Sequence, residues 1–287
     1  MSRPIVVGVS GSDESLAAAD WAADEAALRG SELRLVNASR WQEHAISALQ
    51  PAKDVAASRA RGLLETTQER IRARHPSVAV TSDEVEDDPA EALLAASSDA
   101  ELLAVGTHGL GTAGGFLFGS VGQEVAATSQ HPVVLVRPAG EDVGRERSGA
   151  GSDRVVLGLD VRQTEDELLD FAFDYAARHE ASLHIVCTWH LPALHRDAAA
   201  PGGAETGLQA ALAGAMRAYR DKFPQVEVEE ETVSGRAGSH LVSAAEGARL
   251  LVVGRRGSPG RGSAHIGPVT HAVIHHAPCA VAVVPHA

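Results

Sequence analysis

The chain has 287 residues, enough for one large domain or for two of ordinary size. Its formal charge of -13 argues against general attraction to nucleic acid or to an anionic membrane, because both bind through surplus Lys and Arg. Aromatic residues make up 3% of a sequence that is 44% hydrophobic, so the core must consist of Ala, Val, Leu and Ile, as in parallel sheets buried on both faces.

The cysteines and the N-terminal residues indicate the cellular compartment in which the protein works. Cys187 and Cys279 show no metal or redox spacing, which suits a reducing environment, and we interpret both as core thiols. The chain enters the strand-like residues 5–7 with no apolar export segment before them, and no run approaches about 20 apolar residues. We therefore expect a cytoplasmic protein.

The first half of the sequence alternates predicted strands and helices. Strands are expected at residues 5–9, 33–38, 78–85, 102–105 and 133–136, from their short apolar runs. Helices are expected from Ser12 or Asp13 to a stop at Gly30, at 55–73, after Pro89, and at 120–129. This alternation predicts a parallel, doubly wound α/β sheet, with ligands beyond the C-terminal ends of the strands.

The second half repeats the first. Residues 155–159 (VVLGL) correspond to residues 5–9 (IVVGV), an offset of 150, and residues 250–254 (LLVVG) correspond to residues 102–106 (LLAVG), an offset of 148. Nearly constant offsets indicate two copies of one fold. We predict a first domain at 1–138, a linker rich in Gly, Ser and charge at 139–153, and a second domain at 154–287.

A glycine-rich segment follows the fourth predicted strand. It reads Gly106-Thr107-His108-Gly109, then nine residues, then Gly119-Ser120-Val121. Glycine lets the backbone approach a ligand, and Gly119-Ser120 opens a helix whose first N–H groups are a ready seat for phosphate oxygens. Ser120 and Gln123 also form a capping-box pattern, so a plain helix start explains the same residues.

This arrangement resembles the ATP-binding signature of universal stress proteins, and the resemblance covers nearly the whole chain twice, including the Trp-Ala-Ala-Asp-Glu-Ala helix at 21–26. It implies two Rossmann-like, adenine nucleotide alpha hydrolase-like domains. It also implies that the loop from Gly106 to Val121 cradles the phosphates of ATP, with help from the Ser120 hydroxyl. Residues 9–10 and 37–38 would hold ribose and adenine, through Val9, Ser10 and Ala38. Many members carry Asp where Ser10 stands, so one hydroxyl acceptor is missing here.

The second half departs from the signature in other ways. Its corresponding residues are Asp160, Thr188, Gly254, Arg255, Gly257 and Gly267. Asp160 keeps the carboxylate, but Pro268 has neither an N–H nor a hydroxyl for a phosphate. Arg255, Arg256 and Arg261 can compensate through charge-assisted bonds, or they form a solvated basic loop. Both interpretations stay open.

Fast phosphoryl transfer is not expected. The lysines are Lys53 and Lys222, and neither lies in a glycine loop, as a P-loop enzyme would require. The sequence contains no nucleophile elbow and no His-Glu-x-x-His helix. Slow hydrolysis of ATP with a bridging Mg2+ stays open, because a bound triphosphate usually brings that ion.

Three other clusters have plainer explanations. His271 and His275 lie four apart on a predicted helix, near His265 and His276, but no third ligand has a convincing spacing, and we interpret them as exposed or half-buried histidines. The acidic residues at 84–88 are interpreted as a solvated loop. Trp41 and Trp189 are expected to cover a core edge or the contact between the halves.

Three functional hypotheses follow. The favoured one is an ATP-binding stress-response sensor or regulator with an unknown protein partner. The alternatives are a slow ATPase or phosphotransferase, and an interaction module that has lost nucleotide binding. The two halves are expected to form an intramolecular pseudo-dimer through the strands at 133–136 and 281–284, which can pair again as a homodimer.

Overall fold

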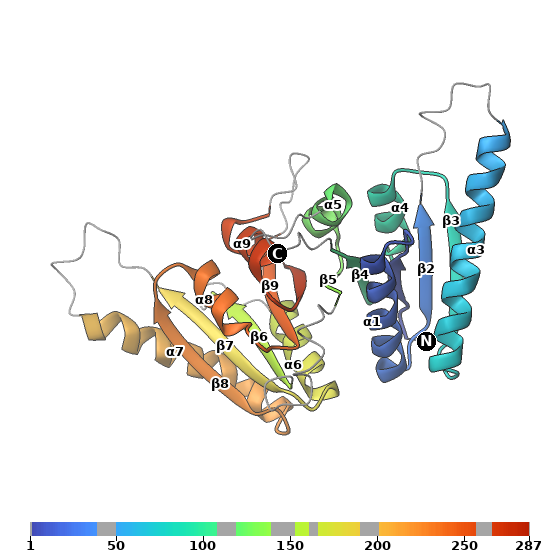
Figure 1. The fold of residues 1–287 in the computed structure, drawn as a ribbon. Coiled ribbons are helices and arrows are strands. Elements are labelled where there is room, and N and C mark those ends of the chain that lie inside the picture. The colour runs from blue at the N-terminus through green and yellow to red at the C-terminus, as the bar shows by residue number, and fades with distance from the viewer. Residues whose placement is uncertain are drawn as a thin grey trace. The chain divides into compact units, whose positions relative to one another are not determined.

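The computed structural model describes residues 2–38, 50–107, 119–138, 153–160, 166–189, 201–256 and 266–286. The chain divides into two compact units, unit 1 (Met1–Gly140) and unit 2 (Glu141–Ala287). Each unit is a doubly wound α/β domain with a parallel sheet, as the sequence predicts (Figure 1).

Unit 1 has its strands in the order β3-β2-β1-β4-β5. They are β1 (Ile5–Gly8), β2 (Leu33–Ala38), β3 (Val80–Val85), β4 (Leu102–Gly106) and β5 (Val133–Val136). The helices are α1 (Asp13–Arg29), α3 (Gln50–Arg74), α4 (Pro89–Ala96) and α5 (Ser120–Thr128). All nine predicted elements are confirmed in these described residues. The main differences are that α3 begins five residues early and β3 two residues late.

Unit 2 repeats this plan with the order β8-β7-β6-β9-β10. Its strands are β6 (Arg154–Leu159), β7 (Ser182–Trp189), β8 (Val228–Ser234), β9 (Leu250–Arg256) and β10 (Ala280–His286). Its helices are α6 (Asp166–Arg178), α7 (Pro201–Lys222), α8 (Ala237–Ala244) and α9 (Pro268–His276). The predicted duplication is therefore present in the fold.

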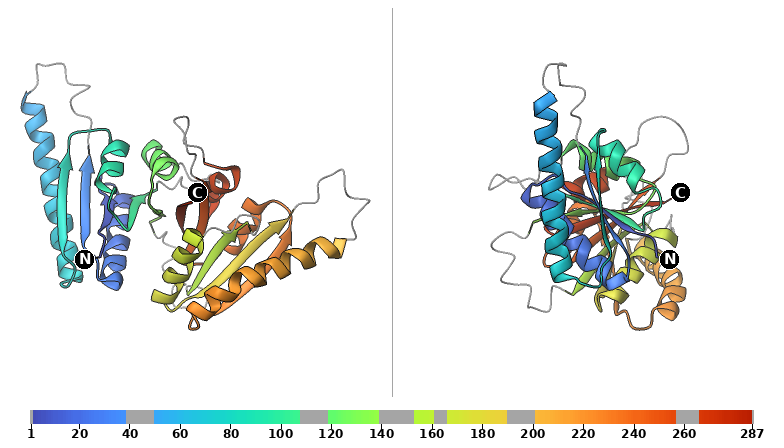
Figure 2. Two further views of the ribbon diagram at one scale, coloured as in Figure 1. Left: turned by 180° about the vertical axis from the view of Figure 1, so that it is seen from behind. Right: turned by 90° about the vertical axis from the view of Figure 1, so that its right-hand side faces the viewer.

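Helices cover both faces of each sheet (Figure 2). In unit 1, α1 and α3 pack together on one face, and α4 and α5 pack together on the other. The inner strands β1 and β4 and the strand β5 are short runs of Val, Leu, Ile, Ala and Gly that are almost fully buried, whereas the edge strand β3 is mostly polar and partly exposed. This is the core that the low aromatic content predicts.

The first helix of unit 1 begins and ends where the sequence indicates. Ser12 is the N-cap, and its hydroxyl accepts a hydrogen bond from the Ser15 amide at 3.3 Å. Gly30 ends the helix in the left-handed region, at φ +63°.

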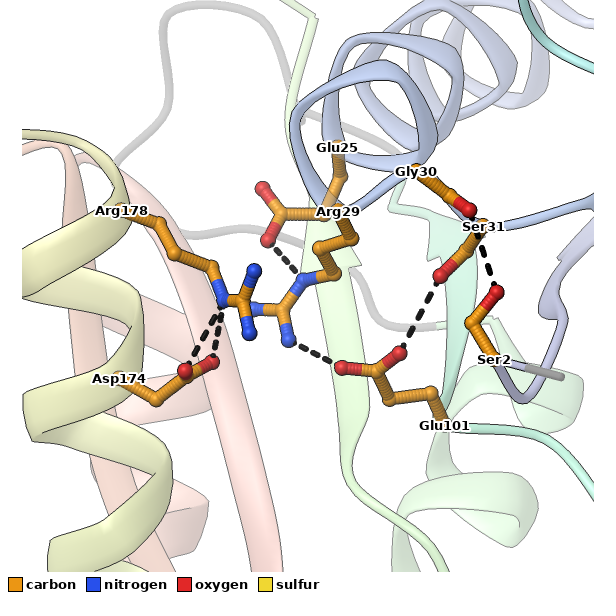
Figure 3. Close-up of polar contacts among 8 residues, drawn as sticks. All are labelled: Ser2, Glu25, Arg29, Gly30, Ser31, Glu101, Asp174 and Arg178. Atoms are coloured by element: carbon orange, nitrogen blue, oxygen red, sulfur yellow. Dashed lines mark hydrogen bonds and ion pairs between the residues drawn. The ribbon is translucent and has the colours of Figure 1, made fainter.

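A buried cluster of charged side chains lies at the N-terminal edge of the unit 1 sheet, where β2 and β4 begin. Arg29 forms ion pairs with both Glu25 and Glu101, and the Ser31 hydroxyl donates to Glu101 at 3.4 Å (Figure 3). The side chains of Glu25 and Arg29 are only 1% and 4% exposed. Burial by itself lowers the pKa of Arg29, but the neighbouring carboxylates of Glu25 and Glu101 together raise it, and the net direction is upward.

Two structural predictions stay predictions. The expected linker at 139–153 lies almost wholly outside the described residues, so the finer domain boundaries remain a proposal. The pseudo-dimer also remains one, because each unit is described only by itself. Among the described residues, no helix combines the length and apolar character needed to cross a membrane.

Candidate nucleotide-binding site

The C-terminal ends of three neighbouring strands form the candidate site of unit 1. β1 lies between β2 and β4, with Gly8 beside Val36 and Val7 beside Ala104. The connections from β1 and β4 lead to helices on opposite faces, which makes this edge the topological switch point where α/β sheets bind ligands. The predicted residues Val9, Ser10, Ala38 and Gly106 all come from these strand ends.

Asn37 fixes this edge of the sheet. Its side-chain Nδ2 donates to the Val9 carbonyl at 2.7 Å, and the residue is buried. The Val9 amide donates to the Val36 carbonyl at 2.8 Å. Asn37 therefore holds β1 and β2 together at their ends, while Ala38 continues the edge and is half-buried.

The turn after β1 is organised by Ser15, a residue that the sequence analysis did not single out. Its hydroxyl accepts from the amides of Ser10 and Gly11 at 3.2 and 3.1 Å and donates to the Ser12 carbonyl at 2.8 Å. These two amides are thereby satisfied within the protein. The Ser10 side chain is exposed, and its hydroxyl lies 3.4 Å from that of Ser12.

Gly106 is required by packing. A Cβ there would lie 2.4 Å from the carbonyl carbon and oxygen of Glu14, in the first turn of α1. The glycine spacing predicts that Gly106 lets a ligand approach, but the contact with α1 is enough to exclude a side chain. The next residue, Thr107, is buried, and its amide and hydroxyl both donate to the Val136 carbonyl, at 2.9 and 3.2 Å.

The start of α5 differs from the starts of α1 and α4. Asp88 caps α4 through the amides of Ala90 and Glu91, as Ser12 caps α1. The N-cap of α5 is Gly119, which offers no side-chain acceptor. The capping-box interpretation is therefore wrong, because Ser120 lies inside the helix and not at the cap.

Among the described residues, nothing crowds this helix start. A Cβ at Gly119 would meet none of them within 4 Å, and its φ of -63° is available to any residue. Neither packing against the described residues nor conformation therefore requires glycine at this position. Gly119 and Ser120 are exposed, and Val121 is half-buried. Unlike Gly106, Gly119 leaves room for a ligand to approach the first amides of α5.

In unit 2 the corresponding strand ends carry different side chains. Leu159 pairs with Cys187, which places Cys187 where unit 1 has Asn37, because the offset between these strands is 150. Burial raises the pKa of the Cys187 thiol to about 12, with further contributions from Asp160 and Glu230. Asp160 is exposed at the end of β6, and Thr188 is half-buried.

Arg255 lies inside β9 and is buried, so the interpretation as a solvated loop residue is wrong for it. Burial lowers the pKa of its guanidinium. Arg256 ends the strand and is exposed. Of the two adjacent arginines of β9, Arg255 is therefore buried and Arg256 faces solvent.

The start of α9 matches the start of α5 in geometry. Gly267 is the N-cap and has no side-chain capping bond, and a Cβ there would meet none of the described residues within 4 Å. Pro268 occupies the first turn, as predicted, and removes one amide. The Thr270 hydroxyl donates to the Gly254 carbonyl at 3.0 Å and so fixes α9 to the end of β9.

The two units also match one family. A model described as the universal stress protein family matches residues 1–137 and again residues 151–285. The chain belongs to the universal stress protein family. Both copies of the predicted repeat are therefore domains of this family, in tandem.

Known relatives share this tandem length. A universal stress protein of Mycobacterium tuberculosis is 28% identical over 305 residues, covering 96% of this chain and 97% of its own. A universal stress protein of Archaeoglobus fulgidus has a solved structure with a TM-score of 0.76 at 18% identity, covering 100% of both chains. One from Pseudomonas aeruginosa gives a TM-score of 0.60 at 17% identity, over 99% and 94%. These likenesses establish the fold of both universal stress protein domains.

Some predicted residues lie outside the described part of the chain. They are Trp41, His108, Gly109, Gly257, Arg261 and His265, together with the side chain of Trp189. Among the described residues, no group of three or more His, Cys, Asp or Glu side chains could hold a metal ion. The residues that sequence reasoning missed, Ser15, Thr107 and Thr270, act through hydrogen bonds whose partners are distant or lie in turns.

Proposed function

We propose that unit 1 binds ATP at the C-terminal edge of its sheet, with the phosphates on the first amides of α5 and on the Ser120 hydroxyl. The observation that carries this is the open, uncapped helix start at Gly119. A helix N-terminus has amides without partners and a partial positive charge, which together favour a phosphate group. The strong negative net charge makes such a local seat necessary for an anionic ligand.

The nucleoside end of the proposed site is formed by Val9, Ser10 and Ala38. The Ser10 hydroxyl is exposed and can accept or donate a hydrogen bond to a ribose hydroxyl. Asn37 and Ser15 act indirectly, because they fix the strand end and the turn. His108 and Gly109 remain proposed phosphate-loop residues outside the described part of the chain, and a bound triphosphate would carry Mg2+.

Unit 2 is proposed to hold a second, weaker nucleotide site. Asp160, Thr188, Gly254, Arg255, Gly257 and Gly267 are its proposed residues. Asp160 offers a hydroxyl acceptor that unit 1 lacks, but Pro268 removes an amide from the phosphate seat. Arg255 is buried in β9, which limits the charge it can present to a phosphate.

The proposed role is that of a stress-response sensor or regulator located in the cytoplasm. Lys222, one of the two lysines considered above for phosphoryl transfer, lies on α7 and forms an ion pair with Asp170 on α6 at 2.6 Å. Its ammonium group therefore has a structural partner. A slow ATPase is the second hypothesis, and its multiple turnovers would disappear in Ser120→Ala. Nucleotide that copurifies with the protein would argue against the third hypothesis, an interaction module without a ligand.

The decisive experiment is a calorimetric titration of the nucleotide-free full chain with MgATP. In Gly119→Val the new side chain occupies the open space where a phosphate must approach, and we expect the tighter binding event to weaken more than tenfold. Ser120→Ala should weaken it less, because only the hydroxyl is lost. The proposed loop residue Gly109 is tested in the same way by Gly109→Val.

Gly267→Val is the matched control, since it adds the same side chain to the equivalent N-cap of unit 2, where space is also open. It should leave the tighter event unchanged. Unaltered affinity in Gly119→Val, with circular dichroism like that of the wild type, would remove the α5 terminus from the site. Mass spectrometry of the ligand released from the native protein identifies the nucleotide and its stoichiometry.

A further inference from the structure

Helix α9 carries three histidines near its end, two of which are adjacent in space. The rings of His271 and His275 have their centroids 4.4 Å apart, whereas the rings of His275 and His276 are 6.4 Å apart. Residues four apart lie on the same face of a helix, one turn above each other. His271 is exposed and His275 is half-buried, with its Nε2 atom out of solvent, so a metal ion reaches the pair from the side of His271.

The spacing of the pair suits metal coordination. Two histidines four apart on one helix face supply two of the ligands in known helical zinc sites.

We propose that His271 and His275 together bind one divalent transition-metal ion on the surface of unit 2. The described residues around the pair provide no third His, Cys, Asp or Glu in reach. Water completes the coordination, and the site is open and exchangeable. Among divalent first-row metal ions, imidazole nitrogens bind Cu2+ more tightly than either Ni2+ or Zn2+. We therefore expect Cu2+ to bind this site most tightly.

Unit 1 provides an internal comparison. α5 and α9 both have nine residues and begin after a glycine N-cap, at Gly119 and Gly267. At the offset of 148, Gln123 and Ala127 stand where unit 2 has His271 and His275. Since these residues cannot form an imidazole pair, the shared fold does not require one. The metal site belongs to unit 2 alone.

The experiment is a titration of the untagged full chain with CuCl2 in a non-coordinating buffer, followed by calorimetry and by electron paramagnetic resonance. The sequence contains 14 histidines, so weak background binding is expected and the comparison between variants decides. We expect one tight event whose resonance shows two nitrogen ligands. His271→Asn and His275→Ala should each weaken it at least tenfold, because a single imidazole remains.

His276→Ala is the matched control, since it removes an imidazole from the same helix but not from the pair. It should retain the tight event with the same spectrum. Equal binding by all variants, the absence of a tight event in the wild type, or loss of the event in His276→Ala would each overturn the proposal. If His275→Ala fails to fold, the exposed His271→Asn variant decides alone.

Discussion

The same position in the two units is stabilised by opposite kinds of chemistry. In unit 1, Glu25 and Arg29 form a buried ion pair near the end of α1. At the offset of 150, unit 2 has Tyr175 and His179, whose rings stack with centroids 4.1 Å apart near the end of α6. One fold thus accepts charge or aromatic packing at this position. The shared fold therefore does not determine which kind of side-chain contact holds the end of this helix in place.

Ion pairs nearer the surface changed much less. Asp20 pairs with Arg74 at 3.1 Å in unit 1, and their counterparts Asp170 and Lys222 pair at 2.6 Å in unit 2. These pairs join the first helix of each unit to its longest helix. Because exposed pairs contribute little stability, Arg and Lys can replace each other there at small cost. A buried pair tolerates fewer substitutions, because replacing one partner leaves the charge of the other buried and uncompensated.

Breaking the buried pair should have the largest effect on stability. Arg29→Met leaves Glu25 buried without its cation, and we expect unit 1 to lose about 3–5 kcal/mol. Urea denaturation measures the loss, and hydrogen exchange assigns it to unit 1, because two domains need not unfold together.

Two comparisons sharpen this result. The double variant Glu25→Leu, Arg29→Met removes both fully buried charges, leaves only the partly exposed Glu101 without its cation, and should recover much of the stability. In unit 2, His179→Ala loses a ring contact and should cost only about 1 kcal/mol. A loss in Arg29→Met no larger than that in His179→Ala would contradict the importance of the buried charges.

A second comparison concerns two equivalent glycines, Gly106 at the end of β4 and Gly254 within β9. Gly106→Ala forces a Cβ against the backbone of Glu14, and we expect a cost of about 1–3 kcal/mol. Gly254→Ala meets the His286 ring, at 2.6 Å from Nε2, and a side chain can move where a backbone cannot. The equivalent substitution in unit 2 should therefore cost less in the same denaturation experiment. Equal losses of stability in the two variants would show that the backbone of α1 moves away from a new Cβ as easily as the His286 side chain does.

The smallest expected effect lies just after α1 and α6. Gly30 and Glu180 occupy equivalent positions with φ of +63° and +51°. Glu180→Gly should stabilise unit 2 by about 0.5–1 kcal/mol, because a side chain is strained there and glycine is not. Gly30→Ala should destabilise unit 1 by about 1 kcal/mol. Thermal unfolding compares the two, and a Glu180→Gly protein less stable than the wild type would contradict the explanation.

Much of the fold was predictable from local patterns. Short apolar runs located the strands, and Ser12, Gly30 and Pro89 marked helix boundaries, because capping depends on residues only a few positions apart. The start of α3 was missed, since the residues from Gln50 onward carry no apolar stripe. The predicted site residues Val9, Ser10 and Ala38 do lie at the ends of neighbouring strands, but the contacts that fix these ends could not be predicted.

The duplication, the α/β class and the family follow from the order of the residues, because they depend on periodicity and on glycine spacing along the chain. The folded structure was needed to separate Gly106, which packing requires, from Gly119, which no described neighbour crowds. It also decided that Arg255 is buried and that two imidazoles meet on α9. The physical reason is that close approach depends on neighbours from other elements, and a linear pattern does not record which neighbours a residue will have.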